Sequence, residues 1–562
     1  MENNKILAHY FNSLLFFILL FATKSAVAQN SPKDTTMNRT VIVEQQYNPK
    51  IESVNKINIL PQIEEPNISK KDVKYDENSQ PIKTFSPREM GVYMTKEKQK
   101  IEKFGYARLG YGNYNNIDSR LNYLFILSPK DRLTISGNMN GMNSKLTKPQ
   151  ITEIEQNKEK WNSRFYRAQT EINYLHQFNK INLDISGQLQ QENFNYANNI
   201  MKIKTTDKQK YTSGNIHFGI KSTKETLPFQ FAAETNMLFF NKQYSISGKA
   251  AKERIFRTKA SAIGSIDEQQ KVTVIAQMDN FSYSSQFKNY TSLLLNSFYE
   301  LRNDDWYLKL GGHLDLAFNY GKDIQISPDL AINYIFSDSY VLYTEAKGGK
   351  TFNSFSRMRE MHPFSDPEIR MTDSYTQLNA TVGFKASPIP NFWFNLYGGY
   401  KIVLDDCAPI YTIDQQNISF TQGKSKNFFS GVDFSYEYKS LAKLSISSKL
   451  FSWKHTAKSL LTQKPKSEVS INASLQIIPK LKLDLGSQYI QYSTSQVNIN
   501  NSNTSSYKMP NVINVKTGFT YQLLPHTSIY AQFDNLLNKK YQYYYTYPTE
   551  GINFLGGLSF HF

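Results

Sequence analysis

The sequence predicts an all-β fold, a transmembrane antiparallel β-barrel of about 22 strands of the kind found in bacterial outer membranes. Three observations predict it: apolar and polar residues alternate over most of the chain, short and long connections alternate, and an apolar strand ends at the last residue. Beyond residue 22 no apolar run approaches the ~18 residues that a membrane helix needs. The mean hydropathy of the 562 residues is −0.52, so any membrane crossing has to use strands.

Residues 1–28 have the three parts of a secretory signal peptide. Lys5 gives a positive start, residues 14–22 are apolar, and residues 26–28 (Ala-Val-Ala) form a small-residue cleavage site. Cleavage would leave Gln29 first. No cysteine lies near Gln29, which argues against a lipoprotein anchor. We therefore expect an exported chain.

The single cysteine, Cys407, excludes an intramolecular disulfide. An exported chain of this size without a disulfide depends on hydrogen bonding and burial, and a closed barrel supplies both. The 37 Tyr and 37 Phe, against 4 Trp, fit aromatic girdles at the two membrane interfaces. In a soluble protein the same aromatic residues would form a core, and composition alone does not distinguish the two.

The chain is basic, with a formal charge of +17. Removal of residues 1–28, which contain Lys5, Lys24 and Glu2, lowers this to +16. Nucleic acid is not an expected partner of an exported chain. The surplus would suit basic loops that meet anionic lipopolysaccharide or attract anionic cargo, and it equally suits a solvated surface.

Residues 29–104 differ in composition from the rest of the chain. They contain six prolines, one glycine (Gly91), many mixed charges and few aromatic residues. Such a segment is a poor independent domain. We interpret it as an extended periplasmic or lumenal segment that needs a partner surface. A vestigial plug is one form that such a segment takes.

Residues 105–562 form the predicted barrel. The alternation is clear at residues 181–186 (Ile-Asn-Leu-Asp-Ile-Ser) and 481–485 (Leu-Lys-Leu-Asp-Leu), and it places one face in lipid and the other in a polar lumen. The 22 expected strands lie near residues 105–112, 117–126, 131–141, 163–176, 180–192, 209–222, 227–240, 254–266, 270–283, 290–302, 305–319, 324–336, 339–349, 374–386, 391–403, 424–439, 443–455, 466–478, 481–492, 510–523, 526–533 and 552–562.

The connections sort by parity. Even-numbered strands are followed by short turns, such as residues 128–130, 303–304 and 524–525. Odd-numbered strands are often followed by long polar loops, at 142–162, 193–208, 241–253, 350–373, 404–423, 493–509 and 534–551. Short periplasmic turns and long extracellular loops are typical of outer-membrane barrels. A β-sandwich has no reason to show this order.

The last strand has one apolar face. Phe554, Leu558, Phe560 and Phe562 share it, and Leu555 is an exception on the polar face. We expect this strand to close the barrel. An ordinary soluble edge strand is the alternative.

Residues 529–541 read Ile-Tyr-Ala-Gln-Phe-Asp-Asn-Leu-Leu-Asn-Lys-Lys-Tyr, and residues 553–558 read Asn-Phe-Leu-Gly-Gly-Leu. This stretch resembles the C-terminal end of TonB-dependent outer-membrane receptors, in which an Asn-Leu-x-Asn-Lys-x-Tyr turn precedes a Gly-rich final strand. A weaker similarity covers residues 340–355. Members of the family also close with 22 strands. The resemblance implies an assembly signal in the last strand (Phe554, Leu558, Phe560 and Phe562), read by the barrel-assembly machinery.

The resemblance further implies energised uptake of a solute across the outer membrane. In the family an N-terminal TonB box pairs as a strand with the inner-membrane partner TonB. A similar short, β-branched sequence is formed by Thr40, Val41, Ile42, Val43 and Glu44. An ordinary edge strand is the alternative.

The family also has a plug domain in the barrel, about twice as long as residues 29–104 and rich in glycine turns. With one glycine and no plug motif, this chain resembles the receptor barrel without its usual plug. An unfilled lumen of 22 strands is a large hole. Either residues 29–104 thread into it as a short stopper, or a separate protein fills it.

Two loops are candidates for ligand contact. Loop 534–551 carries Tyr541, Tyr543, Tyr544 and Tyr545, which suit stacking on sugars or aromatic ligands; the alternative places these rings in the outer interface girdle and the loop base. Loop 350–373 carries a basic group beside two methionines. Its members are Arg357, Arg359 and His362.

Nothing in the sequence predicts an enzyme, a cofactor or a metal site. The eight histidines lack zinc spacing, and no Gly-x-Ser-x-Gly or phosphate-binding glycine loop occurs. Asp405 and Asp406 fall in a predicted long loop, where paired acids are usually solvated, and Cys407 beside them has no expected role.

Two functional hypotheses from different classes follow. The first is a receptor or transporter of the TonB-dependent type, gated by residues 29–104. The second is a plugless porin or a structural barrel that serves as a platform for a surface partner such as a lipoprotein. The resemblance favours the first, and the solute is not readable from the sequence.

Overall fold

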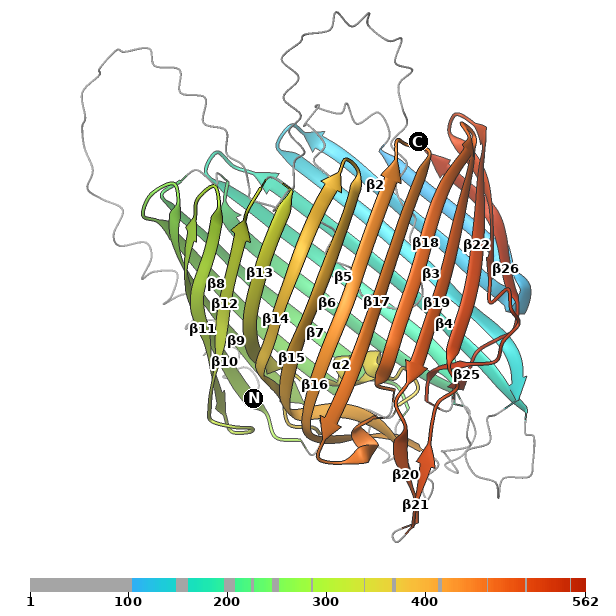
Figure 1. The fold of residues 1–562 in the computed structure, drawn as a ribbon. Coiled ribbons are helices and arrows are strands. Elements are labelled where there is room, and N and C mark those ends of the chain that lie inside the picture. Colours follow the sequence, from blue (N-terminus) through green and yellow to red (C-terminus); the bar gives the residue numbers. More distant parts are fainter. Residues whose placement is uncertain are drawn as a thin grey trace, which may run out of the picture. The chain divides into compact units, whose positions relative to one another are not determined.

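The computed structural model describes residues 104–147, 160–196, 208–223, 227–244, 252–284, 287–337, 339–365, 370–412, 417–461, 463–500, 503–545 and 547–562. These residues form a closed antiparallel β-barrel of 22 strands (Figure 1). No helix among them is long and apolar enough to cross a membrane. The predicted signal peptide and TonB-box-like strand, and residues 29–103 of the predicted stopper, lie outside the described residues.

The barrel strands are β1 (Gly105–Gly112), β2 (Asn116–Ser128), β3 (Asp131–Thr147), β4 (Lys160–Gln177), β5 (Ile181–Asn195), β6 (Lys208–Ser222), β7 (Phe229–Lys242), β8 (Lys252–Ser265), β9 (Gln270–Tyr283), β10 (Tyr290–Arg302), β11 (Trp306–Phe318), β12 (Ile324–Ile335), β13 (Tyr340–Thr351), β14 (Ser374–Ile389), β15 (Phe392–Thr412), β16 (Asn417–Tyr438), β17 (Ala442–His455), β18 (Pro465–Ile478), β19 (Leu481–Tyr492), β22 (Val512–Leu524), β23 (Thr527–Asp534) and β26 (Asn553–His561). Each corresponds to one of the predicted strands. The fold class is therefore confirmed.

Smaller elements lie in the connections. They are the helical turns η1 (Asn113–Asn115) and η2 (Lys458–Leu461), the helix α2 (Phe355–Met361), and the hairpins β20 (Ser495–Asn500) with β21 (Asn503–Tyr507) and β24 (Gln542–Tyr544) with β25 (Tyr547–Pro548). In Figure 1 the C-terminus lies at the upper rim, and α2 and the β20–β21 hairpin lie at the lower end.

The barrel closes where its first strand meets its last. Strand β26 pairs antiparallel with β23 on one side and with β1 on the other, with Leu109 opposite Leu558. At the short-turn end the backbone N–H of Phe104 donates to the carbonyl oxygen of Phe562 (2.7 Å). Because every barrel strand has two neighbours, the sheet has no free edge.

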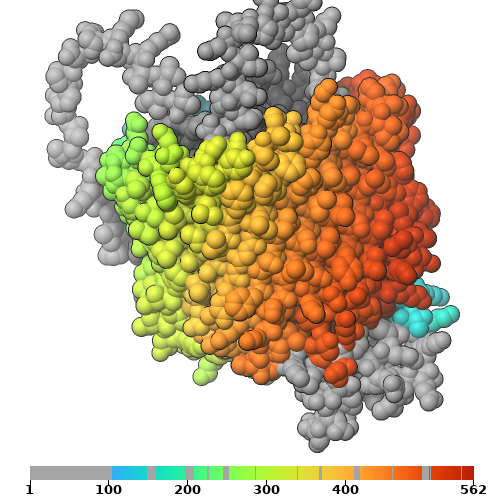
Figure 2. Space-filling view, in the orientation of Figure 1, coloured from blue at the N-terminus to red at the C-terminus, as the bar shows by residue number. Residues whose placement is uncertain are grey.

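The two faces of the wall have different chemistry. Outward side chains are apolar, as in Leu342, Leu396 and Ile471, which are exposed on the molecular surface. Inward side chains are polar, as in Lys347 and Asn395. Figure 2 shows the outer surface as a continuous wall. An exposed apolar band outside a polar lumen is the pattern of a barrel surrounded by lipid.

In the last strand, Phe554, Leu558, Phe560 and Phe562 are exposed on the outer face. Leu555, the apolar exception on the inner face, is buried. A Cβ at Gly110 would lie 2.0 Å from the hydroxyl of Tyr530 and 2.6 Å from the side chain of Leu555. The glycine therefore makes room for both inward side chains at the seam.

One predicted loop is wrong. Residues 404–423 were expected to form a long polar loop, but most of them extend β15 and β16, where Cys407 pairs with Gln422. The register shifts between Val403 and Asp406, and Asp405 has a φ of 50°. Strands that continue past the bilayer no longer face lipid, so their sequence loses the apolar alternation that identifies a membrane strand.

We predict that Ile471→Arg destabilises the barrel and that Asn472→Arg does not. Ile471 lies on the outer face midway along β18, and the adjacent Asn472 is exposed on the inner face. An arginine facing lipid at the bilayer midplane costs about 2–4 kcal/mol, whereas the lumen is polar.

The free energy of unfolding in phospholipid vesicles, measured by denaturant titration, checks this prediction. Equal losses in the two variants would contradict the assignment of the outer face to lipid.

Candidate functional site

Two long loops fold inward at the end of the barrel opposite the C-terminus. One joins β13 to β14 and contains α2; the other joins β23 to β26 and contains β24 and β25. We call the described residues of these two loops, 352–365 with 370–373 and 535–545 with 547–552, the cap. Many side chains of these loops are buried, so the cap is a packed unit and not a set of solvated loops.

The helix of the cap is held at its start by both local and distant groups. The Ser354 hydroxyl accepts a hydrogen bond from the backbone N–H of Arg357 (3.2 Å), as an N-cap does. The Glu253 carboxylate of β8 accepts from the backbone N–H of Phe355 (3.0 Å). A carboxylate at the N-terminus of a helix is favourable, so Glu253 fixes α2 to the barrel wall.

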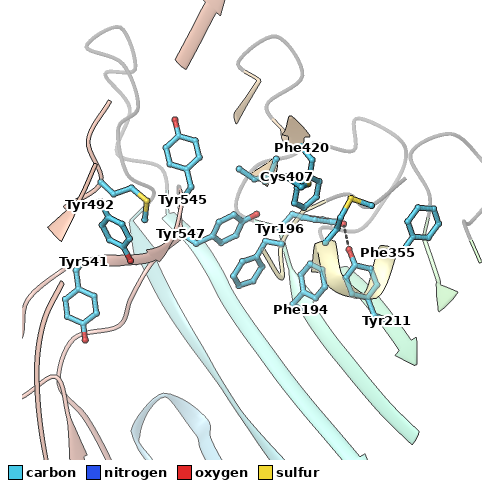
Figure 3. Packing of buried hydrophobic residues seen from close by; sticks show 14 of the residues in the cluster. Phe194, Tyr196, Tyr211, Phe355, Cys407, Phe420, Tyr492, Tyr541, Tyr545 and Tyr547 are labelled. Carbon is cyan, nitrogen blue, oxygen red and sulfur yellow. Dashed lines mark hydrogen bonds between the residues drawn. The ribbon is translucent and has the colours of Figure 1, made fainter. Parts of the chain in front are cut away.

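A hydrophobic cluster joins the cap to opposite sides of the barrel (Figure 3). Its buried members come from strands β4–β7, from the cap, and from strands β15, β16, β19 and β22, with Tyr196 just after β5 and Met509 just before β22. They are Trp161, Phe194, Tyr196, Tyr211, Phe240, Phe355, Met358, Phe364, Cys407, Ile418, Phe420, Ile490, Tyr492, Met509, Val512, Tyr541, Tyr545 and Tyr547. Since β4–β7 and β15–β22 lie across the ring from each other in the strand order, the cluster spans the mouth of the barrel.

Ring stacking ties the two cap loops together. The rings of Phe364 and Tyr547 are parallel, with centroids 3.9 Å apart. Trp161 of β4 packs edge-on against Tyr547 at 5.3 Å, and Phe194 of β5 packs edge-on against Phe364 at 5.4 Å. Such aromatic pairs contribute about 0.5–1.5 kcal/mol each beyond the burial of their area.

A buried ionic group fastens the first cap loop to β4 and β5. Glu192 is 1% exposed and forms ion pairs with Arg359 of α2 and with Arg167, the latter at 2.5 Å. The amide of Gln190 donates to the same carboxylate at 3.0 Å. Removing one partner from a buried pair is strongly destabilising, by about 3–5 kcal/mol. Arg359 therefore positions the helix in the mouth.

His362 joins the first cap loop to the second. Its side chain is fully buried, and Nε2 donates to the backbone carbonyl oxygen of Tyr545 (3.0 Å), which defines the neutral tautomer. The Tyr211 hydroxyl donates to the carbonyl oxygen of Ser365 (2.9 Å), just beyond. Burial lowers the pKa of His362 to about 4, so the ring is neutral at physiological pH.

The end of the first cap loop is held by a carboxylate and an arginine. Asp373 accepts from the Tyr290 hydroxyl (3.2 Å) and from the backbone N–H of Asn353 (3.3 Å), and burial raises its pKa to about 6. The Arg370 guanidinium lies 3.6 Å from the ring centroid of Tyr320 and 4.9 Å from that of Tyr290. These cation–π contacts fasten the loop to the β9–β12 side of the mouth.

The structure places the predicted ligand residues inside the cap. Arg359, His362, Tyr541 and Tyr545 are buried, and Arg357 donates to Asn353. The remaining two are partly buried: Tyr543 donates to Gln488 (3.0 Å), and the Tyr544 ring lies 5.6 Å from that of His362. The structure thus brings the two predicted loops together. In this conformation their side chains bind wall residues such as Glu192 and Gln488, and His362 binds the other cap loop. The hypothesis that they bind a ligand requires the cap to open.

Sequence reasoning missed the wall residues that receive the cap. Phe194 follows Glu192 at an even position of β5, and Tyr196 continues this parity just beyond the strand. The outward face of β5 uses odd positions such as Ile185 and Leu189. The signal in the sequence was the presence of aromatic residues at the inward-facing, normally polar positions of a strand, close to its loop end. They indicate an inner core at the mouth.

The described residues contain no group of three or more His, Cys, Asp or Glu that could hold a metal ion. Asp406 is instead bound by Lys464 and by the Ser425 hydroxyl (2.6 Å), and Cys407 is a buried free thiol. These residues are structural parts of the extended β15–β16 hairpin.

No family model and no curated protein matches this sequence. Solved structures do match the fold. The ferripyoverdine receptor of the outer membrane of Pseudomonas aeruginosa aligns with a TM-score of 0.61 at 11% identity, over 82% of this chain and 72% of the receptor. The ferric-catecholate import receptor Fiu of E. coli K12 gives 0.59 at 9%, over 82% of each chain. The siderophore receptor PirA of Acinetobacter baumannii gives 0.62 at 10%, over 82% of this chain and 80% of PirA.

At these identities the likeness is one of fold. The chain has the 22-stranded barrel of outer-membrane transport receptors. The expectation that it lacks their plug is not confirmed, because it concerns residues 29–104, of which only Phe104 is described.

We predict that the cap loosens below neutral pH through His362. Burial lowers the pKa of His362 from 6.5 to about 4, so the closed cap loses stability as the pH falls through this range; at pH 5 the loss is about 2 kcal/mol. His362→Gln retains a donor for the Tyr545 carbonyl and does not titrate there. Hydrogen exchange of residues 355–365 should therefore accelerate relative to the variant by more than tenfold between pH 7.5 and pH 5.

Comparison with His362→Gln at each pH removes the contribution of Asp373, which has the opposite sign. Its raised pKa means that the closed cap gains stability as the pH falls through about 6. A ratio of exchange rates that does not change with pH would contradict the role of His362.

Proposed function

We propose that this protein is an outer-membrane receptor or transporter, not an enzyme, that takes up a still unidentified solute through a gated barrel. Its location in the outer membrane is supported by the closed 22-stranded sheet and the outward apolar face. The likeness to ferric-siderophore receptors supports transport as the class of function.

The observation that carries this proposal is the closed mouth. A passive pore needs an open path, whereas here a buried aromatic cluster spans the mouth, and the Glu192–Arg359 ion pair holds α2 to one side of it. A mouth built to close suits a protein that opens for a particular solute. The alternative, a plugless porin or a platform for a surface lipoprotein, leaves this core without a purpose.

The periplasmic side of the proposal involves residues 29–104. We propose that they stop the lumen from the side opposite the cap, and that Thr40, Val41, Ile42, Val43 and Glu44 pair as a strand with TonB. The resemblance of residues 529–541 to the family supports this assignment. The exported chain would begin after residue 28.

Two further assignments belong to the same proposal. Phe554, Leu558, Phe560 and Phe562, exposed on the outer face of β26, would present the closing strand to the barrel-assembly machinery, and basic loops would meet lipopolysaccharide. When the cap opens, its residues would contact the solute; these are Arg357, Arg359, His362, Tyr541, Tyr543, Tyr544 and Tyr545.

We predict that large channels open only when both barriers are removed. Met358 of α2 is 0% exposed, so Met358→Asp places a carboxylate in the cap core and expels the helix. In planar bilayers the mature protein, Met358→Asp alone and the deletion of residues 29–104 alone should be silent, and the combination should conduct. Glu360→Asp puts an aspartate on the exposed side of the same helix and is the matched control.

Heat-dependent migration on gels verifies that each variant retains a folded barrel. Conductance of Met358→Asp alone would show that residues 29–104 leave the lumen open, which favours the porin. Silence of the combination would contradict a solute path through the lumen.

We predict that Ile42→Pro weakens binding to TonB by more than tenfold. Proline lacks the backbone N–H that an added strand donates and is excluded from strand interiors. Binding of the mature protein to a purified periplasmic domain of TonB from the same organism, measured by interferometry, checks this. Ile57→Pro, which places a proline at a β-branched position of the same segment but outside residues 40–44, should bind as the unmodified protein does. Equal binding by all three proteins would remove the TonB box from the proposal.

A further inference from the structure

A cavity of about 280 Å³ lies in the inner wall of the barrel, near the loop end of β13–β15. The residues that line it are Leu294, His313, Lys347, Gly348, Gly349, Lys350, Thr351, Thr376, Asn379 and Lys401. None of these lining residues carries a carboxylate, while three carry an ammonium group. The lining is therefore positively charged, and hydroxyl and amide groups accompany the charge.

The strand register places two of the lysines on either side of an amide. Lys347 of β13 is directly opposite Asn379 of β14, and Asn379 is directly opposite Lys401 of β15. Directly opposed residues of antiparallel strands have their Cβ atoms about 4.5–5.5 Å apart. Lys347, Asn379 and Lys401 therefore form one row across three strands, on the inner face.

A β-bulge adds the third lysine to the same wall. In a regular strand Lys347 and Lys350 would point to opposite faces, but the register shifts between Lys347 and Gly349. Gly349 has a φ of 126°, which favours glycine, and a Cβ at Gly348 would lie 2.3 Å from the Cβ of Ser327. As a result the Lys350 ammonium also points inward, where it donates to the Ser292 hydroxyl (3.0 Å).

The three lysines differ in how their charge is compensated. Lys347 pairs with Glu345 at 2.8 Å, and Lys350 lies in the field of Asp373 and Asp315. The side chain of Lys401, which is partly buried, has no hydrogen bond or ion pair with any other described residue. The carboxylate that acts on it, Asp406, is held by Lys464 and Ser425.

We propose that this cavity binds an oxyanion group, a carboxylate or a phosphate, with the Lys401 ammonium as its principal contact. Lys347 would face the oxyanion from the other end of the row. The Asn379 amide, which lies between the two lysines, would donate a hydrogen bond to it. The volume is at the lower limit for small-molecule sites, so it suits a small anion or one end of a larger molecule. The inference rests on the proposed transport role, since it gives the solute or the stopper its chemistry.

The oxyanion has two possible sources. It belongs either to a solute in the lumen or to an acidic side chain of residues 29–104, which include Glu64 and Glu65. Both would meet the same lysine. The experiment therefore has one arm for each source and uses the full mature chain.

The first arm measures binding of inorganic phosphate to the purified protein in detergent by equilibrium dialysis. For a solute site we expect saturable binding that weakens at least tenfold in Lys401→Gln, since a hydrogen bond to a charged group is worth about 1.5–3 kcal/mol. Lys385→Gln, on the neighbouring strand β14 and outside the cavity lining, should bind phosphate as the unmodified protein does.

The second arm treats the same protein with a carbodiimide, which joins amines to carboxylates in contact, followed by mass spectrometry. A link from Lys401 to a residue in 29–104, with no phosphate binding, would support the proposal with the chain's own carboxylate as occupant. The Lys347–Glu345 pair is the internal positive control.

The proposal is overturned if phosphate binds Lys401→Gln as well as the unmodified protein, or if neither phosphate binding nor a Lys401 link is found. Both arms use purified protein without TonB or a membrane. A failure of the conductance prediction would thus leave this result unaffected.

Discussion

The structure depends on one constraint: in lipid, every backbone N–H and C=O group has to be paired within the protein. Pairing of β26 with β1 leaves no strand edge with unpaired backbone groups in the barrel sheet. An even number of antiparallel strands then brings both ends of the barrel to one rim, where Phe104 and Phe562 are hydrogen bonded. The opposite rim carries neither the start of β1 nor the end of β26, and its long loops build the cap.

The cap is a second core with a different origin from the barrel. In the membrane-spanning part of the described strands, the apolar side chains face lipid and do not pack into an interior core. Where strands such as β5 and β16 continue toward the loop end, apolar side chains turn inward, as Phe194 and Phe420 do. Burial of such rings, for example of Phe194 against Phe364 of the cap, supplies a hydrophobic contribution there, and buried ion pairs such as Glu192–Arg359 fix the arrangement.

The barrel was predictable because its signal is local and repeated. The alternation within a few residues, as in residues 181–186, indicates which face of a membrane strand is apolar. The lengths of the flanking connections indicate in which direction the strand crosses the membrane. The cap was not predictable, because His362 and Tyr545 meet over a separation of 183 residues. The residue types in both loops were noticed, but their mutual burial was not foreseen. Two further features were not predicted: the polar stretch of paired strand around Cys407 and the bulge at Gly349. Neither follows the apolar–polar alternation that identifies the other strands.

The aromatic cluster has a mechanical consequence. A closed sheet without a filled interior resists stretching along its strands, but a wide ring deforms easily from a circle to an ellipse. The cluster connects strands β4–β7 to strands on the opposite side of the ring, β15–β22, through the cap. It therefore resists deformation of the ring across that diameter. Release of the cap would then remove this link as well as uncover the mouth, so the cross-section of the barrel would become easier to deform.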